Sequence, residues 1–237
     1  MKILNLECSA TPASVAITEN GEILASSFVN VKLTHSETLM PMIENTLSAA
    51  KLTIADIEGL AITNGPGSFT GIRIGISALK GLAAPKNLPC AAVSTLQAMA
   101  QNYIDCDCIV CAVMDARCNQ VYNALFEIEN GVVTRLCDDR ALMCDELAQE
   151  IKKLSQKSDK CVIIVGDGAQ IFYPFVEALE NVRLSAPARR FQNAVGVGVV
   201  AQENFSKGET ISSKELLPFY LRLPQAEREL KAKEEKK

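Results

Sequence analysis

The stretch ILNLECSATPASVAITENG, residues 3–21, decides the fold because most of its features return later in the chain. It contains an apolar run that ends in the acidic residue Glu7, a second β-prone run, and an Asn-Gly pair at 20–21. Short β-prone runs bounded by turn residues predict strands, and an Asn-Gly pair between two of them predicts a tight hairpin. With a third run at 23–29, the opening is predicted to be a three-stranded meander.

The second copy begins with the apolar run 109–114, which ends in Asp115 as the first run ends in Glu7. A β-prone run at 121–128 and a second Glu-Asn-Gly triplet at 129–131 follow. The acid and the Asn are 13 residues apart in the first copy, from 7 to 20, and 15 apart in the second, from 115 to 130. A hairpin loop tolerates so small a difference, so the sequence predicts a duplicated α/β unit.

The remaining elements follow the same order in both halves. Thr34 and Glu37 have the spacing of a capping box, and apolar residues then recur at helical intervals. Ser68 is a plausible N-cap for a second helix. The first half is predicted to hold a helix at 35–51 with Pro41 inside it, a strand at 59–63 and a helix at 69–83; the second half a helix at 141–154, a strand at 161–165, a Gly-Asp-Gly turn and another helix.

These patterns divide the chain into three parts. We predict an N-terminal domain over 1–103, a second domain over 104–223 and a charged tail over 224–237. The fold class is α/β, with each domain a mixed β-sheet flanked by helices. At the level of the fold, this pair of domains resembles the actin-like and Hsp70-like ATPase architecture, which is also called ASKHA or RNase H-like and is shared by sugar kinases. Fold alone does not transfer an activity.

Composition limits the classes of protein that the chain can represent. Its 237 residues are 48% hydrophobic and 22% charged, which excludes a disordered or low-complexity protein. The net charge of −4 argues against a broad nucleic-acid or membrane footprint built by this chain alone. No apolar run approaches the roughly 20 residues that span a bilayer, and polar residues interrupt the start too early for a signal peptide. We therefore expect a cytoplasmic protein.

Cysteine and histidine are poorly placed for a metal site or for nucleophilic catalysis. Nine cysteines are spread through globular sequence, and the dense group CDCIVC at 106–111 leads into an apolar run, which favours a buried strand over a metal site. His35 is the sole histidine, so a pair of histidine metal ligands cannot form, and Ser-His-Asp catalysis would have no other candidate base. We predict no catalytic residue and no metal site.

The strongest local signal is NGPGSFTGIRIG, residues 64–75, at a predicted strand-to-helix turn. Its exposed N–H groups and helix N-terminus suit an anion, but it lacks the lysine of a Walker sequence. The alternative is a tight turn whose glycines supply unusual backbone angles and close packing. On the helix that follows, Gly71, Gly75 and Ala78 form one stripe, beside a second stripe of Ile72, Ile76 and Leu79. One stripe could meet a partner chain, or both could pack within the chain.

Weak candidates for cofactor binding are the two strand-end acids and their neighbours. Glu7 and Asp115 could flank a cleft between the domains, where paired carboxylates would hold Mg²⁺, or each could cap its own hairpin. The weak candidates are Glu7, Ser9, Asp115 and Gly166.

Five ordered motifs resemble the bacterial TsaB (YeaZ) family over most of the chain. These proteins take part in making N6-threonylcarbamoyladenosine at position 37 of tRNAs that read codons beginning with A. The first strand commonly ends in Asp-Thr-Ser in this family, whereas this chain has Glu7-Cys8-Ser9. The matching motifs are HSETLMP at 35–41, GPGSFTGIRIG at 65–75, Asp115-Ala116-Arg117 with Val121-Tyr122, GDGA at 166–169 and PFYLR at 218–222.

The resemblance implies a non-catalytic subunit that pairs with TsaD, the catalytic paralogue, through its two N-terminal helices. It also implies TsaE as a further partner, contact with tRNA only through the complex, no cofactor of its own apart from a possible ATP or ADP at the complex interface, and a self-pair when TsaD is absent. The alternative is a Mg-nucleotide-dependent ATPase or small-molecule kinase. The expected interface residues are His35, Leu39, Met42, Ile43, Thr46, Gly71, Ile72, Gly75, Ala78 and Leu79.

Overall fold

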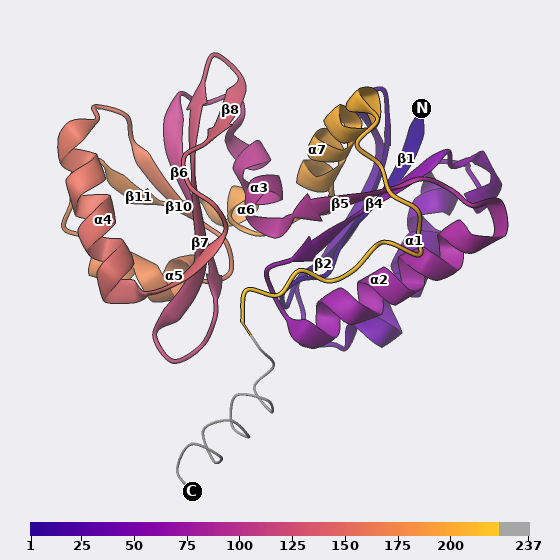
Figure 1. The fold of residues 1–237 in the computed structure, drawn as a ribbon, viewed down its shortest axis with the longest axis horizontal. Coiled ribbons are helices and arrows are strands. Elements are labelled where there is room, and N and C mark those ends of the chain that lie inside the picture. The colour runs from indigo at the N-terminus through magenta and orange to yellow at the C-terminus, as the bar shows by residue number, and fades with distance from the viewer. Residues whose placement is uncertain (223–237) are drawn as a thin grey trace, which may run out of the picture.

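A computed structural model describes residues 1–222 of the chain and shows two α/β units side by side (Figure 1). The charged tail predicted at 224–237 lies outside these residues. None of the helices in the described range has the length and apolar character of a membrane-spanning helix.

The first unit is built on a five-stranded mixed sheet in the order β3-β2-β1-β4-β5. Strand β1 is central: it pairs antiparallel with β2 and parallel with β4. The Asn20-Gly21 turn, with both residues at positive φ, joins β2 to β3 as predicted. The strands are β1 (Lys2–Glu7), β2 (Ala13–Glu19), β3 (Glu22–Val29), β4 (Gly59–Gly65) and β5 (Cys90–Ser94).

Helices cover both faces of this sheet because the apolar side chains of its strands point alternately to one face and to the other. Leu4 and Leu6 pack in the core beneath α1 (His35–Ala49) and α2 (Phe69–Ala83), whereas Ile3 packs beneath α7 (Ala194–Lys207). The predictions of helices at 35–51 and 69–83 are confirmed, with Pro41 inside the first. Short 3₁₀ helices lie at Ile54–Asp56, Ala84–Lys86, Gln101–Tyr103 and Tyr173–Phe175.

The second unit repeats this plan around β6. Strand β6 pairs antiparallel with β7 and parallel with β10, as β1 does with β2 and β4, so the predicted duplication is confirmed. The sheet has the order β11-β10-β6-β7-β8, and β9 also pairs with β7. Its strands are β6 (Cys108–Asp115), β7 (Gln120–Glu129), β8 (Val132–Arg135), β9 (Arg140–Met143), β10 (Val162–Val165) and β11 (Val182–Leu184).

The helix predicted at 141–154 begins later than expected. Residues 140–143 form β9, which pairs antiparallel with β7, and the helix α4 covers Cys144–Lys157. The β9 segment has the apolar spacing of a helix, but its pairing with a neighbouring strand overrides that local signal. The other helices of this unit are α3 (Thr95–Ala100), α5 (Ala169–Phe172) and α6 (Pro187–Arg190).

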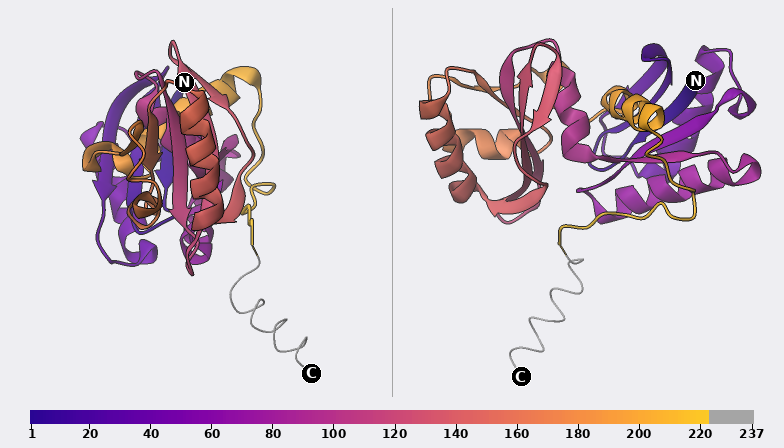
Figure 2. Two further views of the ribbon diagram at one scale, coloured as in Figure 1. Left: turned by 90° about the vertical axis from the view of Figure 1, so that its left-hand side faces the viewer. Right: turned by 45° about the horizontal axis from the view of Figure 1, so that its top comes forward.

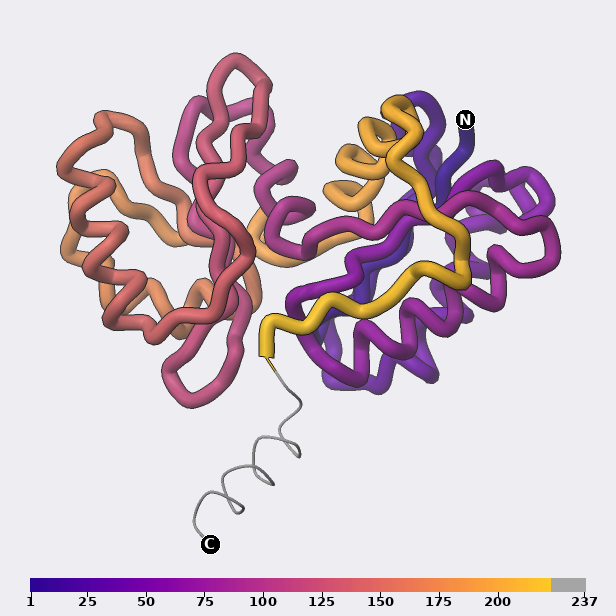
Figure 3. The backbone as a smooth tube through the Cα atoms, viewed as in Figure 1, coloured from indigo at the N-terminus to yellow at the C-terminus, as the bar shows by residue number. Residues whose placement is uncertain are grey.

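The chain returns to the first unit after the second sheet is complete. Helix α7 packs on β1, β2 and β5 and also against α3 (Figure 2). Residues 208–222, which we call the strap, then run past β5 and α2 towards the second unit (Figure 3). Cys90 and Ile211 exchange two backbone hydrogen bonds of 2.9 Å, and Leu216 is fully buried in the first core. The second domain predicted to begin at residue 104 is therefore not confined to the second sheet, because α7 and the strap pack on the first unit.

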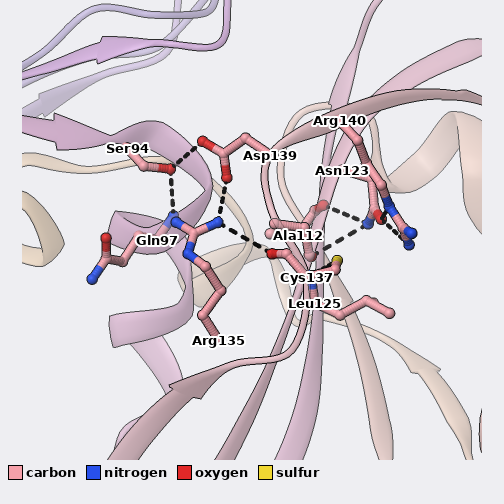
Figure 4. Close-up of polar contacts among 10 residues, drawn as sticks. Ser94, Gln97, Ala112, Asn123, Leu125, Arg135, Cys137, Asp139 and Arg140 are labelled. Carbon is pink, nitrogen blue, oxygen red and sulfur yellow. Dashed lines mark hydrogen bonds and ion pairs between the residues drawn. The ribbon is translucent and has the colours of Figure 1, made fainter. Parts of the chain in front are cut away.

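A polar network joins the two units at the start of α3 (Figure 4). Ser94, the last residue of β5, caps α3 by accepting from the Gln97 N–H, and its Oγ donates to Asp139 at 2.6 Å. The other carboxylate oxygen of Asp139 accepts from Arg135 at 2.5 Å. Charge-assisted hydrogen bonds of this kind are about twice as strong as neutral ones. The network therefore fixes the β8–β9 connection of the second unit on the last strand of the first.

Candidate functional site

A cleft of about 530 Å³ lies between the two units. Its walls come from the segments after β1, β4, β6 and β10 and from the end of the strap. These are the carboxyl ends of strands in both sheets, where α/β folds generally place their ligand sites. The lining includes Ser9, His35, Ser68, Asp115, Asp167 and Arg222.

The glycine-rich turn forms one wall, and its glycines allow close contact within the chain itself. The Gly65-Pro66 peptide bond is cis, and Gly65 has a φ of +138°. A methyl group on Gly65 would overlap the carbonyl oxygen of Phe219 in the strap, and one on Gly67 would overlap that of Ser9. The Ser68 N–H donates to the same Ser9 oxygen at 2.6 Å. These contacts favour the tight-turn interpretation over a phosphate cradle.

The start of α2 is held by its cap and by the strap. Ser68 accepts from the Gly71 N–H at 3.2 Å, which confirms the predicted N-cap. The ring of Phe69 stacks on Tyr220 at a centroid distance of 4.7 Å. The Arg73 guanidinium lies 3.7 Å from the Phe69 centroid, and its Nε donates to the Tyr220 hydroxyl at 2.8 Å. The PFYLR motif is therefore the element that fastens the strap over the glycine-rich turn.

Glu7 lies beneath the cleft rather than in it. Its carboxylate is fully buried, and one oxygen accepts from the N–H and the hydroxyl of Ser9 at 2.6 and 2.5 Å. Its other oxygen has no hydrogen-bond partner within residues 1–222. Burial raises the pKa of Glu7, while the bonds from Ser9 oppose that rise. Ser9 lines the cleft, but its N–H and hydroxyl both donate to Glu7. Glu7 therefore orders the loop that follows β1.

The second copy of the acid is more accessible. Asp115 is exposed, lines the cleft and accepts from the Arg117 N–H at 2.7 Å, so it caps its own hairpin. Gly166 is buried, and a side chain there would overlap the Val113 carbonyl oxygen. Gly166 therefore lets β10 turn tightly against β6. No group of three or more His, Cys, Asp or Glu side chains suited to a metal ion occurs in the described part of the chain.

Asp167 lines the cleft, although it was not among the candidate binding residues predicted from the sequence. It follows Gly166, lines the cleft and accepts from the Gln192 side chain at 2.8 Å. Burial raises its pKa to about 6, and the neighbouring carboxylates of Asp115 and Glu7 add to the rise. Its place in the GDGA turn is the one signal that could have identified it.

The side chains expected at a partner interface are mostly part of the first core. The close contacts of Gly71 and Gly75 are with Cys8, and His35 Nε2 bonds to the Ala10 carbonyl at 2.7 Å. These side chains therefore do not form a docking surface, because the helices already bury that face against β1 and β4. The residues so buried are His35, Leu39, Met42, Ile43, Thr46, Gly71, Ile72, Gly75 and Leu79; Ala78 is half-buried.

The opposite faces of α1 and α2 remain exposed. On α1, Met40 is 40% exposed, and Glu44 also faces solvent. On α2, Ser77 and Gly81 are exposed, and a methyl group on Gly81 would meet no atom within 4 Å. A partner of these helices would therefore contact the outer face, one residue away from the stripes that the sequence pattern emphasised.

Comparison with known proteins identifies the family. TsaB from Escherichia coli strain K12, a tRNA threonylcarbamoyladenosine biosynthesis protein, is 31% identical over 236 residues, which cover 99% of this chain and 100% of the relative. The chain belongs to the TsaB (YeaZ) family. TsaB from Bacillus subtilis strain 168 is 28% identical, with 96% of both chains covered.

Two further findings agree with membership of the TsaB family. The YeaZ structure from Pseudomonas aeruginosa superposes with a TM-score of 0.78 at 26% identity, covering 93% of this chain and 99% of that one. The model of the TsaD family, described as tRNA N6-adenosine threonylcarbamoyltransferase, matches residues 23–230. That match begins within β3 and continues through the second unit and the strap.

Proposed function

We propose that the chain is a non-catalytic partner of the TsaD transferase in the formation of N6-threonylcarbamoyladenosine at position 37 of tRNAs that read codons beginning with A. It pairs with TsaD and keeps that subunit in its active shape. TsaE joins the pair, tRNA is bound through the complex, and the assembly works in the cytoplasm. The observation that carries this proposal is the end-to-end match with TsaB proteins of threonylcarbamoyladenosine biosynthesis.

The arrangement of the acids supports a partner over a nucleotide-hydrolysing enzyme. Glu7, which would be the first metal-binding carboxylate of an ATPase of this fold, is buried beneath the cleft and engaged by Ser9. Asp115 accepts from its own hairpin. A carboxylate that coordinates Mg²⁺ has to reach the ion. Glu7 is fully buried and does not line the cleft, so it is not placed to share an ion there with the exposed Asp115.

The match to the TsaD family supports pairing with that protein. A chain that shares the TsaD framework presents a similar two-helix layer, and related subunits often pair through corresponding surfaces, as in isologous dimers. The exposed faces of α1 and α2 offer such a layer, and they are not covered by other described parts of the chain. The same surface would support a homodimer when TsaD is absent.

Reconstitution of the modification tests this function. Threonylcarbamoyladenosine is measured on tRNA in a mixture of TsaC, which makes the threonylcarbamoyl adenylate, with TsaD and TsaE, in the presence and absence of the chain. A second mixture contains only the chain and TsaC. We expect product only when TsaD and the chain are both present. Product without TsaD would make this chain the transferase, and equal product without the chain would refute the proposal.

Substitutions on the outer helix faces test the surface itself. Met40→Arg on α1 and Ser77→Arg on α2 place a charge on exposed positions without entering the core. Ser206→Arg on α7 is the matched control, because it is exposed on the opposite side of the first sheet. We expect the first two variants to weaken binding to TsaD in titration calorimetry and the control to bind as the unchanged chain does. Equal binding by all three variants would place the interface elsewhere.

The alternative is an ATPase or small-molecule kinase that uses the cleft. The observation in its favour is that Asp115 and Asp167 both line a cleft of about 530 Å³, within the range of small-molecule sites. Calorimetry with Mg-ATP separates the two functions. Micromolar binding by the isolated chain that is lost in Asp167→Asn would support the enzyme.

A further inference from the structure

Basic side chains from three separate segments line the cleft, and we call the part of the lining formed by Lys32, Leu33, Phe219 and Arg222 its mouth. Lys32 comes from the loop between β3 and α1, Arg117 from the turn between β6 and β7, and Arg222 from the end of the strap. Neither Lys32 nor Arg222 forms an ion pair within residues 1–222. Arg222 donates one N–H to the Ala116 carbonyl at 3.2 Å, and its other donors have no hydrogen-bond partner among residues 1–222.

Apolar and aromatic groups line the same cleft as these cations. Phe219 and Leu33 both line the cleft and are 45% and 56% exposed. Tyr122 lines it from the second unit. The backbone at Phe219 is anchored because its N–H donates to the Asn64 carbonyl at 2.7 Å. The ring therefore projects from a fixed point of the main chain and is accessible to a ligand.

The lining of the cleft also carries negative charge. Exposed Asp115 accepts from the Arg117 N–H, and half-buried Asp167 accepts from the Gln192 side chain. Carboxylates repel a phosphate, whereas Lys32 and Arg222 attract one. An anionic ligand is therefore favoured on Lys32 and Arg222 and disfavoured beside the two carboxylates.

Cations beside exposed aromatic rings are the groups that proteins use to bind single-stranded nucleic acid. Arginine suits phosphate because its planar fork presents several donors. A strand with phosphates on Lys32 and Arg222 would bring its bases to the cleft that the rings also line. An acidic protein segment would use the cations but would gain little from an exposed aromatic face.

We propose that a single-stranded segment of RNA crosses the mouth of the cleft, with phosphates on Lys32 and Arg222 and a base stacked on Phe219. This inference rests on the proposed function, which supplies tRNA as the RNA, and adds a direct contact between this chain and that substrate. The net charge of −4 limits the contact to a few phosphates. Binding by the chain alone is accordingly weak, with a Kd on the order of 10 μM.

The test measures binding of the full chain to a fluorescently labelled, unmodified tRNA transcript by anisotropy at several salt concentrations. The double variant Lys32→Gln, Arg222→Gln removes both proposed phosphate contacts. The matched control Lys152→Gln, Lys153→Gln removes two exposed charges from α4, away from the cleft. Circular dichroism and urea unfolding check that each variant is folded, and Lys32→Gln alone retains the bond from Arg222 to Ala116.

We expect the double variant to reduce the slope of log K against log salt by about 1.4, because each single-strand phosphate contact contributes roughly 0.7. The control is expected to retain the slope of the unchanged chain. Phe219→Ala is expected to lower affinity about fivefold or more without changing the slope, since stacking carries no counterion release. This split separates the aromatic contact from the charges.

Several outcomes would overturn the inference. One is no binding of tRNA by the unchanged chain at tens of micromolar protein; another is an equal slope in the double variant and the control. Binding of a polyglutamate peptide without binding of tRNA would assign the mouth to an acidic protein segment. Displacement of tRNA by AMP at the same concentration would assign it to a free nucleotide. Because the reconstituted modification assay uses the unchanged chain, it tests the proposed function independently of these results.

Discussion

Replacing Gly71 with alanine is expected to destabilise the fold, although the residue lies on a helix, where alanine is ordinarily favoured. Gly71 sits in the first turn of α2, against the loop that follows β1. A methyl group there would overlap the Cys8 carbonyl oxygen and would lie 3.0 Å from His35 Cδ2. The carbonyl belongs to the backbone, so it cannot rotate away as a flexible side chain could.

The size of the effect follows from two opposing contributions. Alanine in place of glycine stabilises a helix interior by up to about 1 kcal/mol. Inserting a methyl group into a closely packed site costs about 1 to 3 kcal/mol, and a backbone obstacle favours the upper part of that range. We therefore expect Gly71→Ala to lower the free energy of unfolding by about 1 to 2 kcal/mol.

Gly81→Ala on the same helix is the matched control, because its methyl group would meet no atom within 4 Å. It retains the gain in helix propensity without the overlap and is expected to raise stability by about 0.5 to 1 kcal/mol. Urea unfolding followed by circular dichroism measures both. A Gly71→Ala protein at least as stable as the unchanged chain would refute the assignment of this glycine to close packing.

Three further changes probe the strap, the junction between the units and the cleft. Leu216→Ala removes a fully buried side chain of the strap and should cost about 2 to 5 kcal/mol in urea unfolding; a loss below 1 kcal/mol would mean that the strap does not anchor the core. Asp139→Asn weakens the bonds to Ser94 and Arg135 and should lower the free energy of unfolding by about 1 to 2 kcal/mol. An unchanged midpoint of urea unfolding would mean that this junction does not stabilise the fold. The folded protein holds the Asp167 proton more tightly than the unfolded chain, because burial raises its pKa from 3.8 to about 6. Its contribution to stability is therefore greatest below about pH 4 and falls by about 3 kcal/mol as the pH rises through 6; Asp167→Asn should remove that part of the decline, and an identical pH profile would contradict it.

Local patterns predicted the first unit well because its signals are local. The Asn20-Gly21 turn, the Ser68 cap and the periodic residues of α1 and α2 depend on neighbours within a few positions, and the structure has each of them. The predicted start of helix α4 was wrong because residues 140–143 form β9, which pairs with β7 from a distant part of the chain. No local pattern reports such a contact.

The candidate site was harder to predict than the fold. Periodicity identified Ile72 and Leu79 as one apolar face, but it could not show that the chain's own core covers that face. The strand-end position of Glu7 suggested a cleft residue, whereas the side chain turns inward onto Ser9. Arg222 joins the cleft only because the strap crosses from one unit to the other, and that path depends on the complete fold.

The return of α7 to the first sheet has a consequence for how the protein is made. Ribosomes release a chain from its N-terminus, so the five strands of the first sheet emerge well before residues 194–207. Until that helix has been synthesised, the apolar face containing Ile3 and Val93 lacks the cover of Val197, Val200 and Ala201. The second sheet needs no such late segment, since its strands and helices are contiguous between α3 and α6. The half of the protein that is translated first is therefore the half that finishes folding last.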